Sequence, residues 1–134
     1  MIANNVKRGK ACEYSFVSEA IKKGLTVCLP TDEANDFDFV TIKNKKINKV
    51  QLRSVYKMKK SFCKRDNLQS ERFCFNLPKD KKDIDVLVLH IEPTNKWYII
   101  PYKDITVGTI AFNPSAKAKG SQYDKYENNW EVLL

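Results

Sequence analysis

The sequence has few of the residues that would build a disulfide-rich or zinc-stabilised fold. Among 134 residues there is one histidine and there are four cysteines, and no two cysteines form a C-x-x-C pair. Structural zinc sites usually take four cysteine or histidine ligands at short spacings, so we expect no zinc site. We expect Cys12, Cys28, Cys63 and Cys74 to be buried free thiols that pack as small apolar side chains.

Long apolar runs are also missing. No stretch approaches the roughly 18 apolar residues of a membrane-spanning helix. The first ten residues, MIANNVKRGK, lack the apolar segment of a secretory signal peptide. We therefore expect no membrane association and a cytoplasmic location. The four glycines and five prolines are scattered, and we find no repeat or low-complexity tract, so we expect one domain over residues 1–134.

Acidic residues are outnumbered, and one long segment has none. The chain carries 24 Lys and Arg residues against 16 Asp and Glu, a net charge of +8, and residues 43–65 are basic without a single acid. A solvated surface normally mixes both signs, so this segment indicates contact with a polyanion such as DNA, although solubility alone is an alternative. We predict nucleic-acid contacts from Lys45, Lys46, Lys49, Lys57, Lys59, Lys60, Lys64 and Arg65.

A short acidic cluster stands directly before the basic segment. It consists of Asp32, Glu33, Asp36 and Asp38. Metal-assisted cleavage of a phosphodiester needs this combination, because carboxylates hold the divalent cation and basic side chains bind the phosphates. The cluster is therefore a candidate catalytic region.

Hydrophobic periodicity predicts an α/β or α+β fold. We expect a helix over residues 9–24 that ends at a glycine, and strands over 25–29, 36–43, 47–56, 72–77, 83–91 and 96–101. Residues 83–91 are almost continuously apolar, which is typical of a central strand. Residues 57–70 show no clear period and predict a loop or short helix. The spacing of Tyr123, Tyr126 and Trp130 predicts a short C-terminal helix with its aromatic side chains in the core.

Two patterns single out possible site residues. Glu13 lies on the predicted helix face of Val17, Ala20 and Ile21, and a carboxylate on an inward face is costly unless something compensates it. In the predicted hairpin, Asp38 lies on a face of the first strand, and Gln51 and Arg53 share a face of the second. Whether these two faces coincide depends on the strand register, which the sequence does not fix.

The order of these segments resembles the PD-(D/E)xK nuclease superfamily. The matching pieces are G-K-A-C-E (9–13), V-C-L-P (27–30), D-F-D-F-V (36–40), K-V-Q-L-R (49–53), D-V-L-V-L (85–89), W-Y-I-I-P (97–101) and Y-E-N-N-W (126–130). More narrowly, the chain is similar to a small bacterial branch of PD-(D/E)xK homing endonucleases and Holliday-junction resolvase-like proteins. The resemblance implies a restriction-endonuclease-like core, with an N-terminal helix packed on a mixed central sheet of about five strands.

The resemblance also implies a role for each matching residue. Asp38 is the central carboxylate that holds Mg²⁺ or Mn²⁺, and Glu13 is a second carboxylate at the site. Gln51 and Leu52 add a side-chain amide oxygen and a backbone carbonyl oxygen, and a glutamine at this place resembles the homing-endonuclease variant. Arg53 stands where the family has lysine. An arginine stays protonated, so it can bind phosphate and stabilise charge but cannot exchange a proton.

Three functions remain open. The first is a metal-dependent DNA endonuclease of the site-specific homing type, with resolvase-like cleavage of four-way junctions as the nearest alternative; cutting a duplex needs two active sites, so we expect a homodimer or tetramer. The second, motivated by Arg53, is a non-catalytic DNA-binding module on the same fold. Arg53 itself is consistent with slow catalysis, with an inactivating substitution, or with a lysine supplied from elsewhere, such as Lys10. The third is a small basic RNA-binding or protein-interaction domain.

Overall fold

Helix α1 (Asn5–Lys22) begins at a side-chain cap and ends at a glycine. The side chain of Asn4 accepts a hydrogen bond from the backbone N–H of Lys7 at 2.9 Å, which satisfies one of the free donors of the first turn. Gly24, just after the helix, has a φ of 86°, a conformation that favours glycine. The computed structural model describes residues 4–63, 68–114 and 120–134, and within them no helix is long and apolar enough to span a membrane.

The main sheet has five strands in the order β1–β2–β3–β6–β7. They are β1 (Thr26–Cys28), β2 (Phe39–Lys43), β3 (Lys46–Val55), β6 (Val86–Ile91) and β7 (Lys96–Pro101). Strands β3 and β6 are parallel and the other neighbours are antiparallel, so the sheet is mixed. Every residue of β6 is buried, because both faces of the sheet are covered. The predicted N-terminal helix and five-stranded mixed sheet are therefore confirmed.

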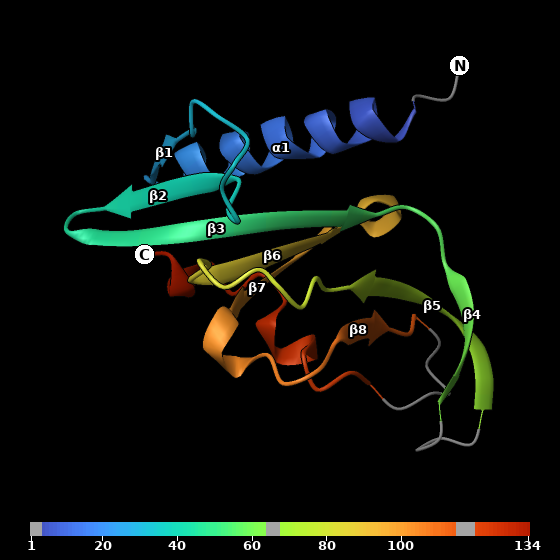
Figure 1. Cartoon of the computed structure of the whole chain (residues 1–134). Coiled ribbons are helices and arrows are strands. Elements are labelled where there is room, and N and C mark those ends of the chain that lie inside the picture. Colours follow the sequence, from blue (N-terminus) through green and yellow to red (C-terminus); the bar gives the residue numbers. More distant parts are fainter. Residues whose placement is uncertain (1–3, 64–67, 115–119) are drawn as a thin grey trace.

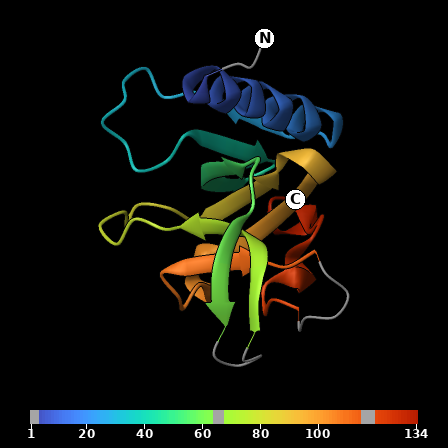
Figure 2. The same ribbon diagram turned by 90° about the vertical axis from the view of Figure 1, so that its right-hand side faces the viewer.

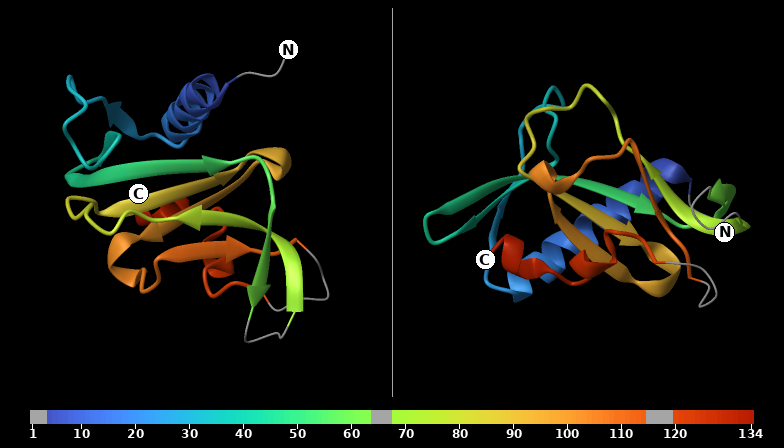
Figure 3. Two further views of the ribbon diagram at one scale, coloured as in Figure 1. Left: turned by 45° about the vertical axis from the view of Figure 1, so that its right-hand side comes forward. Right: turned by 90° about the horizontal axis from the view of Figure 1, so that it is seen from below.

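The chain is arranged in three layers, with α1 on one face of the main sheet and a small sheet on the other (Figures 1 and 3). The small sheet contains β4 (Lys59–Cys63), β5 (Leu68–Asn76) and β8 (Thr109–Phe112). Between α1 and the main sheet, Phe16 is fully buried and its ring lies 5.9 Å from that of Trp130. On the opposite face, Tyr98 stacks on Phe112 at 4.0 Å. These are two separate hydrophobic cores on the two sides of one sheet.

The segment from residue 57 to residue 70, predicted as a loop or short helix, instead contains β4 and the start of β5. The two strands form an antiparallel hairpin that projects away from α1 (Figure 2). Its cross-strand pairs are largely polar, as in Lys60 opposite Glu71, so no apolar alternation marks it in the sequence. Strand β8, which pairs with β5, was also not predicted.

The C-terminal segment is not the predicted helix. It forms two 3-10 turns, η3 (Asp124–Tyr126) and η4 (Trp130–Val132), and Asn128 between them adopts a left-handed conformation with a φ of 53°. Tyr123 and Trp130 are nevertheless buried, as predicted, whereas Tyr126 is only partly buried.

Two details of side-chain burial also differ from the expectation. The buried residues of α1 are Cys12, Phe16 and Ala20, whereas Ile21, predicted to face inward, is 59% exposed. The inward stripe is therefore rotated around the helix axis, because it follows the i, i+4 spacing from Cys12. Cys28 is a free thiol but is exposed rather than buried, since it lies on edge strand β1.

Candidate active site

Asp38 lies immediately before the first residue of β2 and contacts the backbone of β3. Phe39 pairs with Val50 in the strand register, and the N–H of Asp38 also donates to the carbonyl oxygen of Val50 at 2.8 Å. Two residues of one strand thus oppose one residue of its neighbour, which is the arrangement of a β-bulge. Bulges change the direction of side chains, and this bulge changes the direction of Asp38, the predicted central carboxylate.

The backbone pairing of β2 with β3 ends at Val50, and beyond it the carboxylate of Asp38 binds the backbone of β3. Its Oδ2 accepts a hydrogen bond from the N–H of Leu52 at 2.8 Å. The N–H and C=O of one residue in an extended strand point to the same side, so the carbonyl of Leu52 faces this edge as well. The structure therefore brings together the predicted oxygens of Asp38 and Leu52. Gln51, between the two backbone contacts, has a buried side chain that is 3% exposed.

Glu13 of α1 contributes to a cavity of about 430 Å³ that Asp38 also lines. The loop between β1 and β2 closes this cavity with further acidic side chains, Asp32 and Glu33. Glu13 is half-buried, and Lys10 compensates its charge through an ion pair of 3.0 Å between Nζ and Oε2. The predicted inward-lying carboxylate thus faces the same cavity as Asp38.

Burial dominates the electrostatics of Asp38 and raises the pKa of its carboxyl group above the ordinary value. The Leu52 N–H and the positive charges of Lys81 and Arg53 act in the opposite direction, while the negative charge of Glu13 adds to the rise. A carboxylate whose anionic form is disfavoured in a cleft is typical of functional sites. A bound cation would favour the anionic form.

The oxygens at this place fit a hard divalent cation. Mg²⁺ is commonly held by one or two carboxylates, neutral oxygens, water and substrate phosphate. Asp38 and Glu13 are the carboxylates that line this cavity, and the backbone of Leu52 lies beside Asp38. Across residues 4–63, 68–114 and 120–134, no three or more His, Cys, Asp or Glu side chains gather closely enough to hold a metal ion by themselves.

Lys81 also acts on this site, and the sequence analysis did not single it out. It lies in the loop between β5 and β6, and its positive charge contributes to the lowered pKa of Asp36 and partly offsets the raised pKa of Asp38. For Asp36 the larger cause is hydrogen bonding from the backbone N–H groups of Asp83 and Lys82, and the net pKa is below the ordinary value. The loop sequence K-D-K-K-D has no apolar period, so nothing in it indicated a position beside Asp38.

The structure divides the predicted DNA-binding residues into two groups at opposite ends of β3 (Figure 1). Lys45 and Lys46 lie at the β2–β3 turn, whereas Lys57, Lys59 and Lys60 are exposed at and beyond the far end of β3. Lys49 lies within β3 and pairs with Asp83 at 2.6 Å. The two remaining predicted contacts, Lys64 and Arg65, lie outside the described residues.

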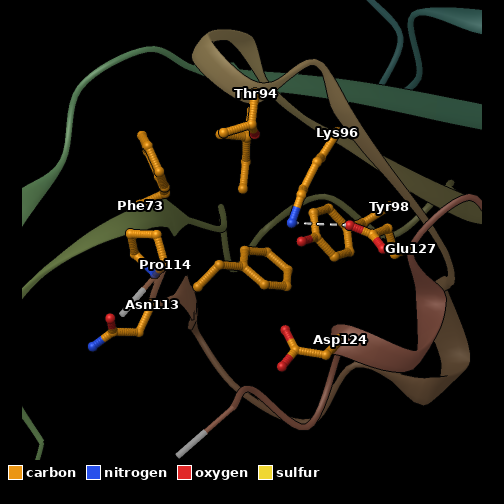
Figure 4. Close-up of a pocket in the computed structure, with 10 residues that line it drawn as sticks. Phe73, Thr94, Lys96, Tyr98, Asn113, Pro114, Asp124 and Glu127 are labelled. Carbon is orange, nitrogen blue, oxygen red and sulfur yellow. Dashed lines mark ion pairs between the residues drawn. The ribbon is translucent and has the colours of Figure 1, made fainter. Parts of the chain in front are cut away.

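A second cavity, of about 240 Å³, lies over the core between the main and small sheets (Figure 4). Phe73, Tyr98 and Phe112 contribute to its wall, and the ion pair of Lys96 with Glu127 crosses one side at 3.3 Å. Asp38, Glu13 and Arg53 are not among the residues that line it. It is therefore separate from the candidate active site.

Comparisons with known proteins identify the family and the fold of this chain. A family model described as PD-(D/E)XK endonuclease matches residues 3–133. Among solved structures, the chain is similar to a bacterial homing endonuclease, I-Ssp6803I, with a TM-score of 0.82 and 18% identity over 99% of this chain and 93% of that one. At this identity the likeness shows the fold alone, and it confirms the predicted restriction-endonuclease-like core. A search of curated proteins found no match.

Proposed function

Because this chain belongs to the PD-(D/E)XK endonuclease family, we propose that it is a metal-dependent enzyme that hydrolyses phosphodiester bonds in double-stranded DNA. The observation that carries the proposal is the position of Asp38. A bulge at the start of β2 presents its partly buried carboxylate beside the Leu52 backbone, in a cavity shared with Glu13. Family membership supports the reaction class, and this geometry supports Asp38 and Glu13 as residues of the site.

Each residue of the site has a proposed role. Asp38 and Glu13 hold Mg²⁺ or Mn²⁺, and Gln51 and Leu52 add the oxygens of an amide and a backbone carbonyl. When bound, the cation neutralises phosphate charge and lowers the pKa of an attacking water. The guanidinium of Arg53 binds the phosphate through two parallel hydrogen bonds and stabilises the charge that develops during hydrolysis.

We also propose that cleavage is site-specific and that the active form is a homodimer or tetramer. The support for specificity is the shared fold with a bacterial homing endonuclease over nearly the whole of both chains. Two strands of a duplex have opposite directions, so a pair of identical chains related by a two-fold axis can present one active site to each strand. The exposed lysines Lys59 and Lys60 on the β4–β5 hairpin are the proposed contacts with the DNA backbone.

Arg53 favours a second candidate function, a DNA-binding module without nuclease activity. An arginine at this position cannot exchange a proton with water or with the leaving group. Such a module would bind DNA without a divalent cation and would tolerate loss of the Asp38 carboxylate. This difference allows the two functions to be separated by experiment.

A cleavage assay on two substrates tests the proposal. We would incubate the protein with a supercoiled plasmid library of random inserts and with a four-way junction, in Mg²⁺ or in EDTA. We expect nicked and linear plasmid in Mg²⁺ only, with the rate lowered at least about 100-fold in Asp38→Asn. Cleavage of the junction but not the plasmid would indicate a resolvase. If both the wild-type protein and Arg53→Lys bind DNA but cleave neither substrate, the result would support the DNA-binding module without nuclease activity.

A further inference from the structure

We infer that Lys81 is the lysine of this active site, and that its ammonium group contacts an oxygen of the scissile phosphate beside Asp38. The inference rests on the proposed nuclease function. It adds to the site a residue that lies outside the β2–β3 hairpin, where the family motif is found.

The first support is the attachment of the Lys81 loop to the segment that carries Asp38. The backbone N–H groups of Lys82 and Asp83 both donate to Oδ2 of Asp36, at 3.1 and 3.0 Å. Asp36 precedes Asp38 by two residues, so their Cα atoms lie at most about 7 Å apart. The backbone next to Lys81 is therefore fixed within side-chain reach of the Asp38 carboxylate.

Further anchors fix the loop from its other side. The hydroxyl of Tyr102 donates to the carbonyl oxygen of Lys81 at 2.9 Å. Asp85 is bound to Lys49 of β3 twice, because its N–H donates to the Lys49 carbonyl and its Oδ2 accepts from the Lys49 N–H, both at 2.9 Å. The two loops before β2 and before β6 emerge on the same side of the molecule (Figure 2). Lys81 is thus held in a defined position rather than on a free loop.

The side chain of Lys81 differs from those of the other lysines near the site. Lys81 is half-buried, whereas its neighbour Lys82 is exposed. Lys10 pairs with Glu13 at 3.0 Å and Lys49 pairs with Asp83 at 2.6 Å. In the part of the chain that the structure describes, Lys81 has no carboxylate within 4.0 Å, although its charge acts on Asp38 more strongly than that of Arg53 does. Its ammonium group is therefore available to a phosphate.

Phosphodiester hydrolysis is also served by an ammonium group at this place, in addition to the guanidinium of Arg53. The guanidinium of Arg53 is planar and best suited to two oxygens of one phosphate, whereas an ammonium is a compact charge with three donors. A lysine beside Asp38 can therefore bind a phosphate oxygen and an attacking water at the same time. Lys10, the alternative considered from the sequence, is already engaged by Glu13.

Substitution of Lys81 with a matched neighbour as control tests the inference. We would compare wild type, Lys81→Met and Lys82→Met for kcat and for KM. We would also measure, in Ca²⁺, how tightly each protein binds the intact duplex that the wild type cleaves in Mg²⁺. We expect Lys81→Met to lower kcat about 100-fold with little change in KM, and Lys82→Met to change it less than about threefold. Urea unfolding of each variant would identify any loss of folding.

A double substitution separates a direct role from a structural one. If Lys81 supplies an ammonium at the phosphate, the double variant Lys81→Met/Arg53→Lys should cleave at least about tenfold faster than Lys81→Met alone. Equal rates for Lys81→Met and Lys82→Met would overturn the inference while leaving the nuclease function intact, and so would a loss that Arg53→Lys does not restore. Absence of cleavage by the wild-type protein would instead remove the proposed function, and the inference with it.

Discussion

Asp36 and Asp38 lie two residues apart, and removing the charge of each should change the stability of the folded protein in opposite directions. Burial raises the pKa of Asp38, whereas hydrogen bonds from the backbone of Asp83 and Lys82 lower the pKa of Asp36. We therefore expect Asp38→Asn to stabilise the metal-free protein at neutral pH. We expect Asp36→Asn, the matched control, to destabilise it.

The size of the Asp38 effect follows from its surroundings. Asparagine keeps a side-chain oxygen that can accept the Leu52 N–H bond, now 2.8 Å long, so the substitution removes mainly the partly buried charge. Lys81 and Arg53 already offset some of the cost of burying that charge. Since the side chain also retains contact with solvent, we expect the free energy of unfolding to rise by only about 0.5–1 kcal/mol.

The pH dependence gives the sign of each effect. A carboxyl group whose pKa is raised in the folded protein stabilises that protein at acidic pH, and the stabilisation is lost as pH rises through the folded pKa. Wild type and Asp38→Asn should thus be equally stable below about pH 4 and should diverge as pH increases. For Asp36, whose folded pKa is lowered, wild type gains stability as pH rises through that pKa, and the variant does not.

Urea unfolding in EDTA at pH 3.5, 5.5 and 7 would measure both variants. The expected result at pH 7 is a higher midpoint than wild type for Asp38→Asn and a lower midpoint for Asp36→Asn. A less stable Asp38→Asn protein at pH 7, or a difference from wild type that does not change with pH, would refute the reasoning about burial of this carboxylate.

Lys59→Ala and Lys60→Ala should each reduce the salt dependence of DNA binding by about one unit of slope, measured by fluorescence anisotropy over a salt series; an unchanged slope would remove that lysine from the interface. Arg53→Met should slow cleavage about 100-fold at saturating DNA, while Arg53→Lys stays within about tenfold of wild type, and equal rates for Arg53→Met and wild type would exclude the phosphate-binding role. Phe16→Ala should lower the free energy of unfolding by about 3–5 kcal/mol, since Phe16 is fully buried between α1 and the sheet, and a loss below about 1 kcal/mol in urea unfolding would contradict that packing.

The central sheet could be predicted because it depends on short-range patterns. The apolar run of β6, the turn at Asn44 and the helix before Gly24 are all visible in the sequence. The approach of Asp38 to Leu52 was not visible, because it depends on a bulge that shifts the register by one residue. A periodic pattern cannot reveal an irregularity in the pairing of two strands.

Other elements were missed for different physical reasons. The part of the β4–β5 hairpin that projects from the body pairs residues 59–63 with residues 68–72, and these pairs are largely polar, so no apolar alternation marks it in the sequence. The aromatic spacing near the C-terminus predicted burial correctly, but Tyr123 and Trp130 are brought inward by 3-10 turns around Asn128 rather than by one helix. Lys81 was missed because its position depends on backbone hydrogen bonds to Asp36, more than 40 residues earlier in the chain.

The most direct test is to locate the cation in crystals of the protein bound to duplex DNA and grown with Mn²⁺. Anomalous scattering identifies the manganese without ambiguity, and the same crystals of Asp38→Asn provide the control. We expect a manganese peak in contact with the Asp38 carboxylate, the Leu52 carbonyl and a DNA phosphate, and no such peak in the variant. Manganese bound elsewhere on the complex, or an unchanged peak in Asp38→Asn, would contradict the assignment of this site.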